Sequence, residues 1–286
     1  MDESTPILEL VRVETADGVV LDGALWRPQR AGKLPVDAFL LVHGTGSNFY
    51  APGVLETYAG QALAGGIAVL RINTRGHDGL CSNPARSGSV KGGAAYERIS
   101  DCVQDVGAWV DWLVGHGFAR IVLVGHSMGS VKAIYAQAYA PHSAVRAIVG
   151  ISPPRFSHER LLSGPCGETF AAEFARASDL VSDGQGETLL AVTQPLRFMA
   201  TAAAITGTIS TVLMLSRSLL TTMRDTSRRS SISCTWVLAF RSIVSIPLWM
   251  SAESSFPSRS IRAHPRMEFS GVRSSCEITA RNSSLA

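Results

Sequence analysis

Glycine almost disappears from the last third of this chain. Residues 201–286 hold two of the 26 glycines, no lysine, no tyrosine and one histidine, His264. They also contain 19 serines and ten arginines. Because the turns of a parallel sheet depend on glycine, this segment does not continue the pattern that precedes it.

Other absences narrow the class of protein. No apolar run follows the acidic and polar residues 1–6, so we expect no secretory signal. The length of 286 residues fits one large domain. The cysteines are odd in number, scattered and without metal-ligand spacing: Cys81, Cys102, Cys166, Cys234 and Cys276. We therefore expect isolated thiols in a reducing cytoplasm, with neither disulfides nor zinc. No part of the sequence implies a metal or an organic cofactor.

The net charge of +3 hides an uneven distribution, because residues 1–200 carry −3 and residues 201–286 carry +6. A basic tail can bind RNA or an acidic surface, but this one lacks interleaved aromatic residues and long basic runs. Nineteen uncharged residues between Arg197 and Arg217 are long enough to span a bilayer, yet they are rich in Thr and Ser. We therefore expect neither a nucleic-acid partner nor a membrane. Composition does not indicate the oligomeric state.

The motif Gly125-His126-Ser127-Met128-Gly129 is the centre of the regular part. An apolar run over residues 121–124 precedes it, and an alanine-rich helical pattern over residues 130–140 follows. In this context Gly-x-Ser-x-Gly predicts a nucleophile elbow, whose strained serine needs glycine on both sides. We expect Ser127 at the carboxyl end of a central strand, above the positive end of the next helix.

Alternating strand and helix patterns surround this motif. Strands are predicted over residues 7–14, 19–26, 38–42, 67–72 and 145–151, and helices over residues 53–64 and 96–113. Residues 79–93 are expected to form a long polar loop. This order predicts an α/β fold with a mostly parallel sheet flanked by helices.

The elbow, together with His43-Gly44-Thr45 after an earlier strand, resembles the α/β-hydrolase superfamily, whose esterases and lipases often carry Gly-His-Ser-Met-Gly. The resemblance covers residues 7 to about 200. It implies that the backbone amides of Thr45 and Met128 form an oxyanion hole, and a loop without bulky side chains suits that role. The alternative for His43-Gly44-Thr45 is a glycine-rich turn without a catalytic role. Serine at the elbow, where the family's dehalogenases and epoxide hydrolases have aspartate, argues against those reactions.

The resemblance also implies a division of the chain. A hydrolase core is expected over residues 1–152 and a helical lid over residues 153–200, with helical segments at 159–162, 168–180 and 188–192. A lid would influence substrate preference. His158 lies in it and is expected to be a surface residue, and Ser130, just after the elbow, is expected to tighten the start of its helix.

A second stretch, residues 73–79, resembles the Asp-x-Arg-Gly-x-Gly turn of the superfamily, with Asn73 in place of aspartate. The resemblance implies a structural role for this turn. His77 and Asp78 suggest a catalytic pair, but neighbouring residues cannot both reach the elbow in the required line, and both precede the nucleophile. We assign them no catalysis.

A serine hydrolase of this fold needs an acid and then a histidine after the nucleophile, because serine alone is a weak nucleophile. Beyond residue 200 the chain order permits Asp225 or Glu253 with His264. Asp225 lacks a preceding strand, a proline interrupts the run before Glu253, and His264 lacks a Gly-x-x-His approach. All three are weak candidates.

The loss of glycine and periodicity suggests a shift of the reading frame near Ala204, which would make residues 201–286 an aberrant, poorly ordered tail. The sequence then supports two functions. One is hydrolysis of an ester, thioester or amide of a small carboxylic acid through an acyl-enzyme on Ser127, with Met128 and Thr45 binding the oxyanion. The other is a catalytically inactive hydrolase-like protein that lacks the triad acid and histidine.

Overall fold

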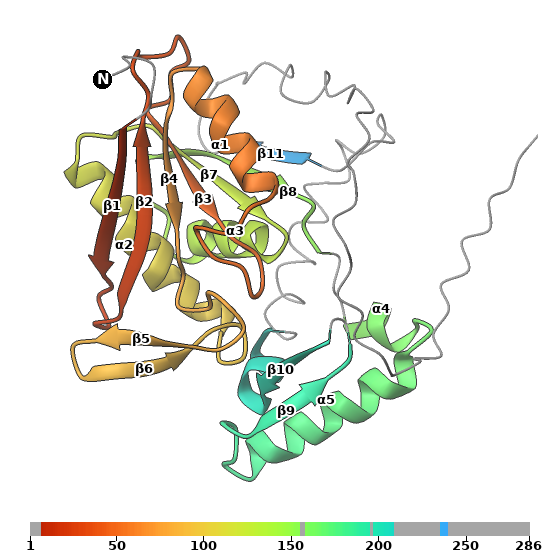
Figure 1. Cartoon of the computed structure of the whole chain (residues 1–286). Coiled ribbons are helices and arrows are strands. Elements are labelled where there is room, and N and C mark those ends of the chain that lie inside the picture. The colour runs from red at the N-terminus through yellow and green to blue at the C-terminus, as the bar shows by residue number, and fades with distance from the viewer. Residues whose placement is uncertain (1–6, 155–157, 195–196, 209–234, 240–286) are drawn as a thin grey trace, which may run out of the picture. The chain divides into compact units, whose positions relative to one another are not determined.

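The computed structural model describes residues 7–154, 158–194, 197–208 and 235–239 (Figure 1). Its main sheet has the strand order β1-β2-β4-β3-β7-β8-β11. The strands are β1 (Ile7–Glu14), β2 (Val20–Arg27), β3 (Ala38–Val42), β4 (Ala68–Ile72), β7 (Ile121–His126), β8 (Val145–Ile151) and β11 (Thr235–Ala239). The four strands β4, β3, β7 and β8 run parallel, whereas β1, β2 and β11 pair antiparallel at the two edges.

The apolar composition of the central strands explains their position. Every residue of β3 and β4 is buried, as expected for strands that are covered on both faces. The helix α1 (Val54–Ala64) lies on one face of the sheet, and α2 (Cys102–Gly115) and α3 (Met128–Tyr139) lie on the other (Figure 1). The predicted α/β fold with a mostly parallel centre is therefore confirmed.

Two predictions about the segment before α2 were wrong. Residues 79–93, expected to form a loop, contain the antiparallel hairpin β5 (Cys81–Ala85) and β6 (Gly88–Gly92). The helix predicted from residue 96 starts only at Cys102, after the 3₁₀ turn η1 (Ile99–Asp101).

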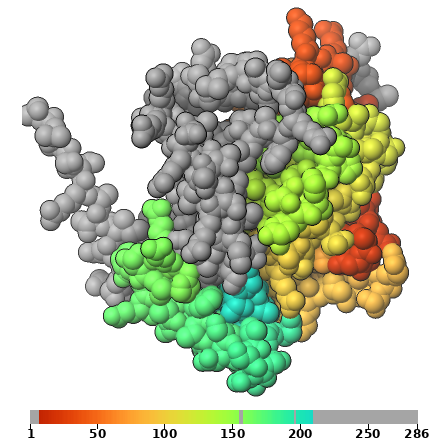
Figure 2. Space-filling view, turned by 180° about the vertical axis from the view of Figure 1, so that it is seen from behind, coloured from red at the N-terminus to blue at the C-terminus, as the bar shows by residue number. Residues whose placement is uncertain are grey.

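Contacts distant in sequence account for the hairpin. Val19 forms a bridge with Ala85, and the Arg86 amide donates a 2.8 Å hydrogen bond to the Gly18 carbonyl. In Figure 2 the hairpin (orange) accordingly lies against the turn between β1 and β2 (red). Local periodicity carries no signal for such pairing.

The segment after β8 contains α4 (His158–Leu162), α5 (Gly167–Ser182), β9 (Leu189–Val192) and β10 (Phe198–Thr201), followed by helical residues 202–208. The strands β9 and β10 form an antiparallel hairpin, so the helix predicted over residues 188–192 was wrong. Burial alternates along β9, with Leu190 and Val192 inside, which is the period of a strand.

A small apolar core holds this segment together. It consists of Phe170, Ala177, Leu190, Val192, Ala200, Ala202, Ala204 and Ile205. The packing thus continues past residue 200, where the predicted lid ends. The Thr201 amide donates a 2.7 Å hydrogen bond to the Ala95 carbonyl and links the segment to the loop before α2. Across the residues that the structure describes, no helix has both the length and the apolar character needed to cross a bilayer.

Candidate active site

Ser127 lies in the tight turn between β7 and α3, with backbone angles φ 53° and ψ −125°. A serine with positive φ is strained, and the surrounding backbone must enforce it. A Cβ atom at Gly125 would lie 2.3 Å from the Gly129 carbonyl oxygen, and one at Gly129 would lie 2.1 Å from the Val42 carbonyl oxygen. Both glycines are therefore required by the close approach of backbone to backbone.

Hydrogen bonds fix the two ends of this turn. The Ser127 amide donates to the Ile151 carbonyl over 2.9 Å. The Ser130 hydroxyl donates to the Gly125 carbonyl over 2.8 Å and ties the first turn of α3 to the end of β7. This contact is consistent with the expectation that Ser130 tightens the start of the helix.

The loop after β3 approaches the serine. A Cβ atom on Gly44 would lie 3.0 Å from the Ser127 Cβ and 3.5 Å from its Oγ, so a side chain at this position would crowd the serine. Thr45 follows Gly44 directly, and Met128 begins α3, where the first amides of a helix lack intrahelical partners. The structure thus brings together the two chain segments that carry Ser127, Met128 and Thr45.

A buried polar network lies behind this loop. The Lys132 ammonium, on α3, is 2.6 Å from the Glu97 Oε1 and donates to the Thr74 hydroxyl over 3.1 Å. The Thr74 amide donates to the His43 Nε2 over 3.1 Å. Burial, and then the charge of Lys132, lower the pKa of His43 well below its ordinary value.

The sequence alone did not identify Lys132 and Glu97 as residues near the site. One signal was present, because Lys132 is one of three lysines in the chain and lies in an otherwise small and apolar helical stretch. Its relative exposure is 0%, which is unusual for a lysine unless it is paired. No feature of the sequence named Glu97 as its partner.

His77 and Asp78 form a hydrogen-bonded pair that is used within its own turn. The His77 Nδ1 lies 2.8 Å from the Asp78 Oδ2, and its Nε2 lies 3.1 Å from the Asn83 Oδ1. Burial raises the pKa of Asp78, but hydrogen bonds from Asn48, His77 and Tyr50 together have a larger effect in the opposite direction. The pKa of Asp78 therefore lies below its ordinary value. Both ring nitrogens of His77 are engaged, which agrees with assigning this pair no catalysis.

Two further expectations concern other histidines and acids. His158 is half-buried and packs edge-on against Phe170 and Phe174, so it is part of the core after β8 and not a purely surface residue. Asp225, Glu253 and His264 lie outside the described residues.

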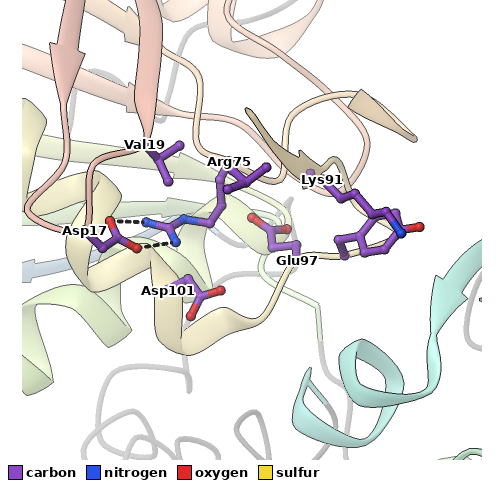
Figure 3. Close-up of a pocket in the computed structure, with 9 residues that line it drawn as sticks. Asp17, Val19, Arg75, Lys91, Glu97 and Asp101 are labelled. Atoms are coloured by element: carbon purple, nitrogen blue, oxygen red, sulfur yellow. Dashed lines mark hydrogen bonds and ion pairs between the residues drawn. The ribbon is translucent and has the colours of Figure 1, made fainter. Parts of the chain in front are cut away.

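A pocket of about 180 Å³ opens next to the network (Figure 3). Its lining includes Glu97, Asp101, Lys91 and Arg75 but not Ser127, Met128 or Thr45. The Arg75 guanidinium points to Asp17, with N–O distances of 2.7 and 3.0 Å, and also binds Asp105. Because Arg75 is already paired with two carboxylates, the pocket does not present it to an anionic ligand.

The comparison with one solved structure, DcsB, agrees with this architecture. DcsB, solved in complex with its substrate analogue, has a TM-score of 0.51 at 14% identity, covering 73% of this chain and 77% of that one. An alpha/beta hydrolase GrgF from Penicillium sp. sh18 has a TM-score of 0.47 at 17% identity, covering 80% and 70%. The Pyrococcus furiosus esterase Pf2001 has a TM-score of 0.42 at 22% identity, and the match spans 58% of this chain but only 55% of the esterase. At such identities the similarity to DcsB shows the fold alone.

Comparison of the sequence with models of protein families identifies the family of this chain. No curated protein matches the chain. A family model described as "Alpha/beta hydrolase family" matches residues 39–267. The match continues past residue 200, where the resemblance was expected to stop, and it includes His264. With a central parallel sheet and a strained serine between strand and helix, the chain belongs to the alpha/beta hydrolase family.

Proposed function

We propose that this protein is a serine hydrolase that cleaves a small ester, thioester or amide through an acyl-enzyme on Ser127. Membership of the alpha/beta hydrolase family supports a hydrolase in general. The observation that carries the finer proposal is the positive φ of Ser127, held between β7 and α3 with Gly44 against it. This geometry raises a hydroxyl above the turn, where a carbonyl carbon can be attacked.

The reaction follows from the groups at the turn. The Ser127 Oγ attacks the carbonyl carbon and loses its proton to a base, and the resulting oxyanion accepts hydrogen bonds from the amides of Met128 and Thr45. Collapse of this intermediate expels the alcohol, thiol or amine and leaves the acyl group on Ser127. A water molecule then attacks the acyl-enzyme, which releases the carboxylic acid and returns the proton to Ser127.

The base and its acid come from the segment after residue 208 in this proposal, with His264 and either Asp225 or Glu253 as candidates. The match of the family model over residues 39–267 supports a contribution from this segment. Among the described residues, His43 and His77 use both ring nitrogens elsewhere.

The second candidate function is a hydrolase-like protein without activity. The occupied nitrogens of His43 and His77 favour it, because neither ring is available to take the proton of Ser127. The shift in composition after residue 200 favours it too, since a reading-frame shift near Ala204 would replace the strands that carry acid and base.

Labelling of the full chain with a fluorophosphonate separates the two functions. An intact triad predicts fast labelling that is lost in Ser127→Ala and falls roughly a thousandfold or more in His264→Ala. An inactive protein predicts no labelling of the unaltered chain. Labelling that persists in Ser127→Ala would refute the assignment of the nucleophile.

Sequencing of the gene tests the reading frame independently. A frameshift predicts that another frame, translated past codon 200, encodes a strand followed by an acid and then Gly-x-x-His. If no frame encodes such a pattern, the frameshift hypothesis is wrong.

A further inference from the structure

The buried network connects three separate elements of the core. His43 follows β3, Thr74 follows β4 and Lys132 lies on α3, the helix that begins at the elbow. The side chains of all three are buried, and Glu97, in the loop before α2, contacts Thr74 and Lys132. The network therefore connects the loop after β3 to the helix that follows Ser127.

The hydrogen bonds determine the state of the His43 ring. Its Nδ1 lies 2.8 Å from the Gly44 carbonyl oxygen, which can only accept, so the Nδ1 carries the proton. Its Nε2 accepts from the Thr74 amide and must be unprotonated. His43 is thus a neutral ring in one tautomer that donates to the Gly44 carbonyl.

This donation fixes a peptide plane that matters for catalysis. The Gly44 carbonyl and the Thr45 amide belong to the same planar unit, and in a trans peptide they point in opposite directions. Holding the carbonyl against the imidazole therefore sets the direction of the Thr45 N–H. The Ser47 amide donates to the same carbonyl over 3.3 Å and closes the loop on the other side.

The ion pair holds Thr74, which in turn holds the ring. The Lys132 ammonium donates to the Thr74 Oγ1. The Thr74 hydroxyl lies 3.2 Å from the Glu97 Oε1 and 3.2 Å from the His43 Nε2, so its side chain links the ion pair directly to the ring. Stability alone does not explain such a pair, because well-packed apolar residues in place of a buried ion pair are often equally stable.

We infer that Lys132 and Glu97 are positioning residues that orient the Gly44–Thr45 peptide through Thr74 and His43. The inference rests on the proposed function, in which the Thr45 amide binds the oxyanion. It assigns to the buried pair of Lys132 and Glu97 a task that neither the family nor the elbow motif specifies.

The test uses the full chain with the double substitution Lys132→Met and Glu97→Leu, which removes both charges and leaves none unpaired in the core. Asp37→Asn is the matched control. Asp37 binds the Arg120 guanidinium and the amides of Ala119 and Arg120 before β3 begins, so its loss weakens the same sheet at the opposite end of its strands.

Two measurements are made on each protein. Amide hydrogen exchange over residues 43–47 should rise about tenfold or more in the double variant, but not in Asp37→Asn and not along α1. Hydrolysis of 4-nitrophenyl butyrate should lose about 10- to 100-fold in kcat, with KM changed less than about threefold. For the matching thionoester the loss of kcat should be much smaller, because its sulfur is a weak acceptor of hydrogen bonds from the oxyanion-hole amides.

Three outcomes would overturn the inference. In the first, hydrogen exchange over residues 43–47 of the double variant stays at the level of the unaltered chain. In the second, exchange rises equally along α1. In the third, exchange over residues 43–47 rises but kcat for the ester is unchanged. If the unaltered chain hydrolyses neither ester and is not labelled at Ser127, the proposed function fails. The exchange measurement then still decides whether the ion pair holds the peptide.

Discussion

At the scale of single residues, the elbow leaves no space for a Cβ atom at Gly129. The nearest atom is the Val42 carbonyl oxygen, which belongs to the central strand β3 and is held between β4 and β7. We expect Gly129→Ala to lower the free energy of unfolding by at least about 2 kcal/mol, since the strand or the helix must shift. Urea unfolding measures this loss, and fluorophosphonate labelling of Ser127 should slow in the same variant.

Gly60 supplies the control for this prediction. It is exposed in α1, and no heavy atom would lie within 4 Å of an added Cβ. Gly60→Ala should therefore raise the free energy of unfolding by about 0.5–1 kcal/mol, because alanine is the better helix former. Equal effects of the two substitutions would contradict the crowding that we describe at the elbow.

His43 predicts how stability depends on pH. Its pKa is far below normal in the folded chain but about 6.5 in the unfolded chain. Below that pH the unfolded chain binds a proton that the folded chain does not. The contribution of neutral His43 to the free energy of unfolding is thus fully present above about pH 6.5. It is lost as the pH falls, by up to about 1.4 kcal/mol per pH unit.

Unfolding free energies of the unaltered chain and of His43→Gln, measured between about pH 5 and 8, test this dependence. The variant will be less stable at every pH because it disturbs the contacts with Gly44 and Thr74. Below about pH 6.5, its unfolding free energy should nevertheless depend less steeply on pH, because up to one proton fewer is taken up on unfolding. Parallel curves for the two proteins would show that His43 does not carry the dependence.

At the scale of elements, one side chain joins α5 to the hairpin of β9 and β10. The Glu173 carboxylate accepts from the Thr193 amide over 3.0 Å, from the Thr193 hydroxyl over 2.7 Å and from the Gln194 amide over 3.2 Å. We expect Glu173→Ala to cost about 1–2 kcal/mol, because three donors lose a charged acceptor. Faster hydrogen exchange at Thr193 and Gln194 should accompany this loss.

Asp179 is exposed on the same helix and serves for comparison. Asp179→Ala should change the free energy of unfolding by less than about 0.5 kcal/mol and leave exchange at Thr193 unchanged. If both substitutions behave alike, Glu173 does not anchor the hairpin.

At the scale of the whole molecule, the uneven charge of the chain leads to a prediction about binding. Residues 1–200 carry −3 and residues 201–286 carry +6, but the basic residues are spread among many serines. We expect the full chain to elute from heparin at low salt. Strong retention that falls steeply with salt would instead favour an RNA or acidic partner, since release of counterions produces that dependence.

Much of the fold around the site could be predicted from the sequence. The apolar runs of β3, β4, β7 and β8 and the glycines on both sides of Ser127 act within a few residues, through burial and backbone sterics. The hairpin of β5 and β6 and the strand β9 could not be predicted in this way. Their hydrogen-bond partners and apolar contacts come from segments distant in the chain.

The sequence by itself determined the strand, the strained serine and the helix, because glycine and apolar patterning enforce them locally. Only the tertiary structure decided that Lys132 meets Glu97 and that His43 holds the Gly44 carbonyl. The physical reason is that a buried charge is tolerated only with a partner, and that partner is chosen by how the folded elements pack.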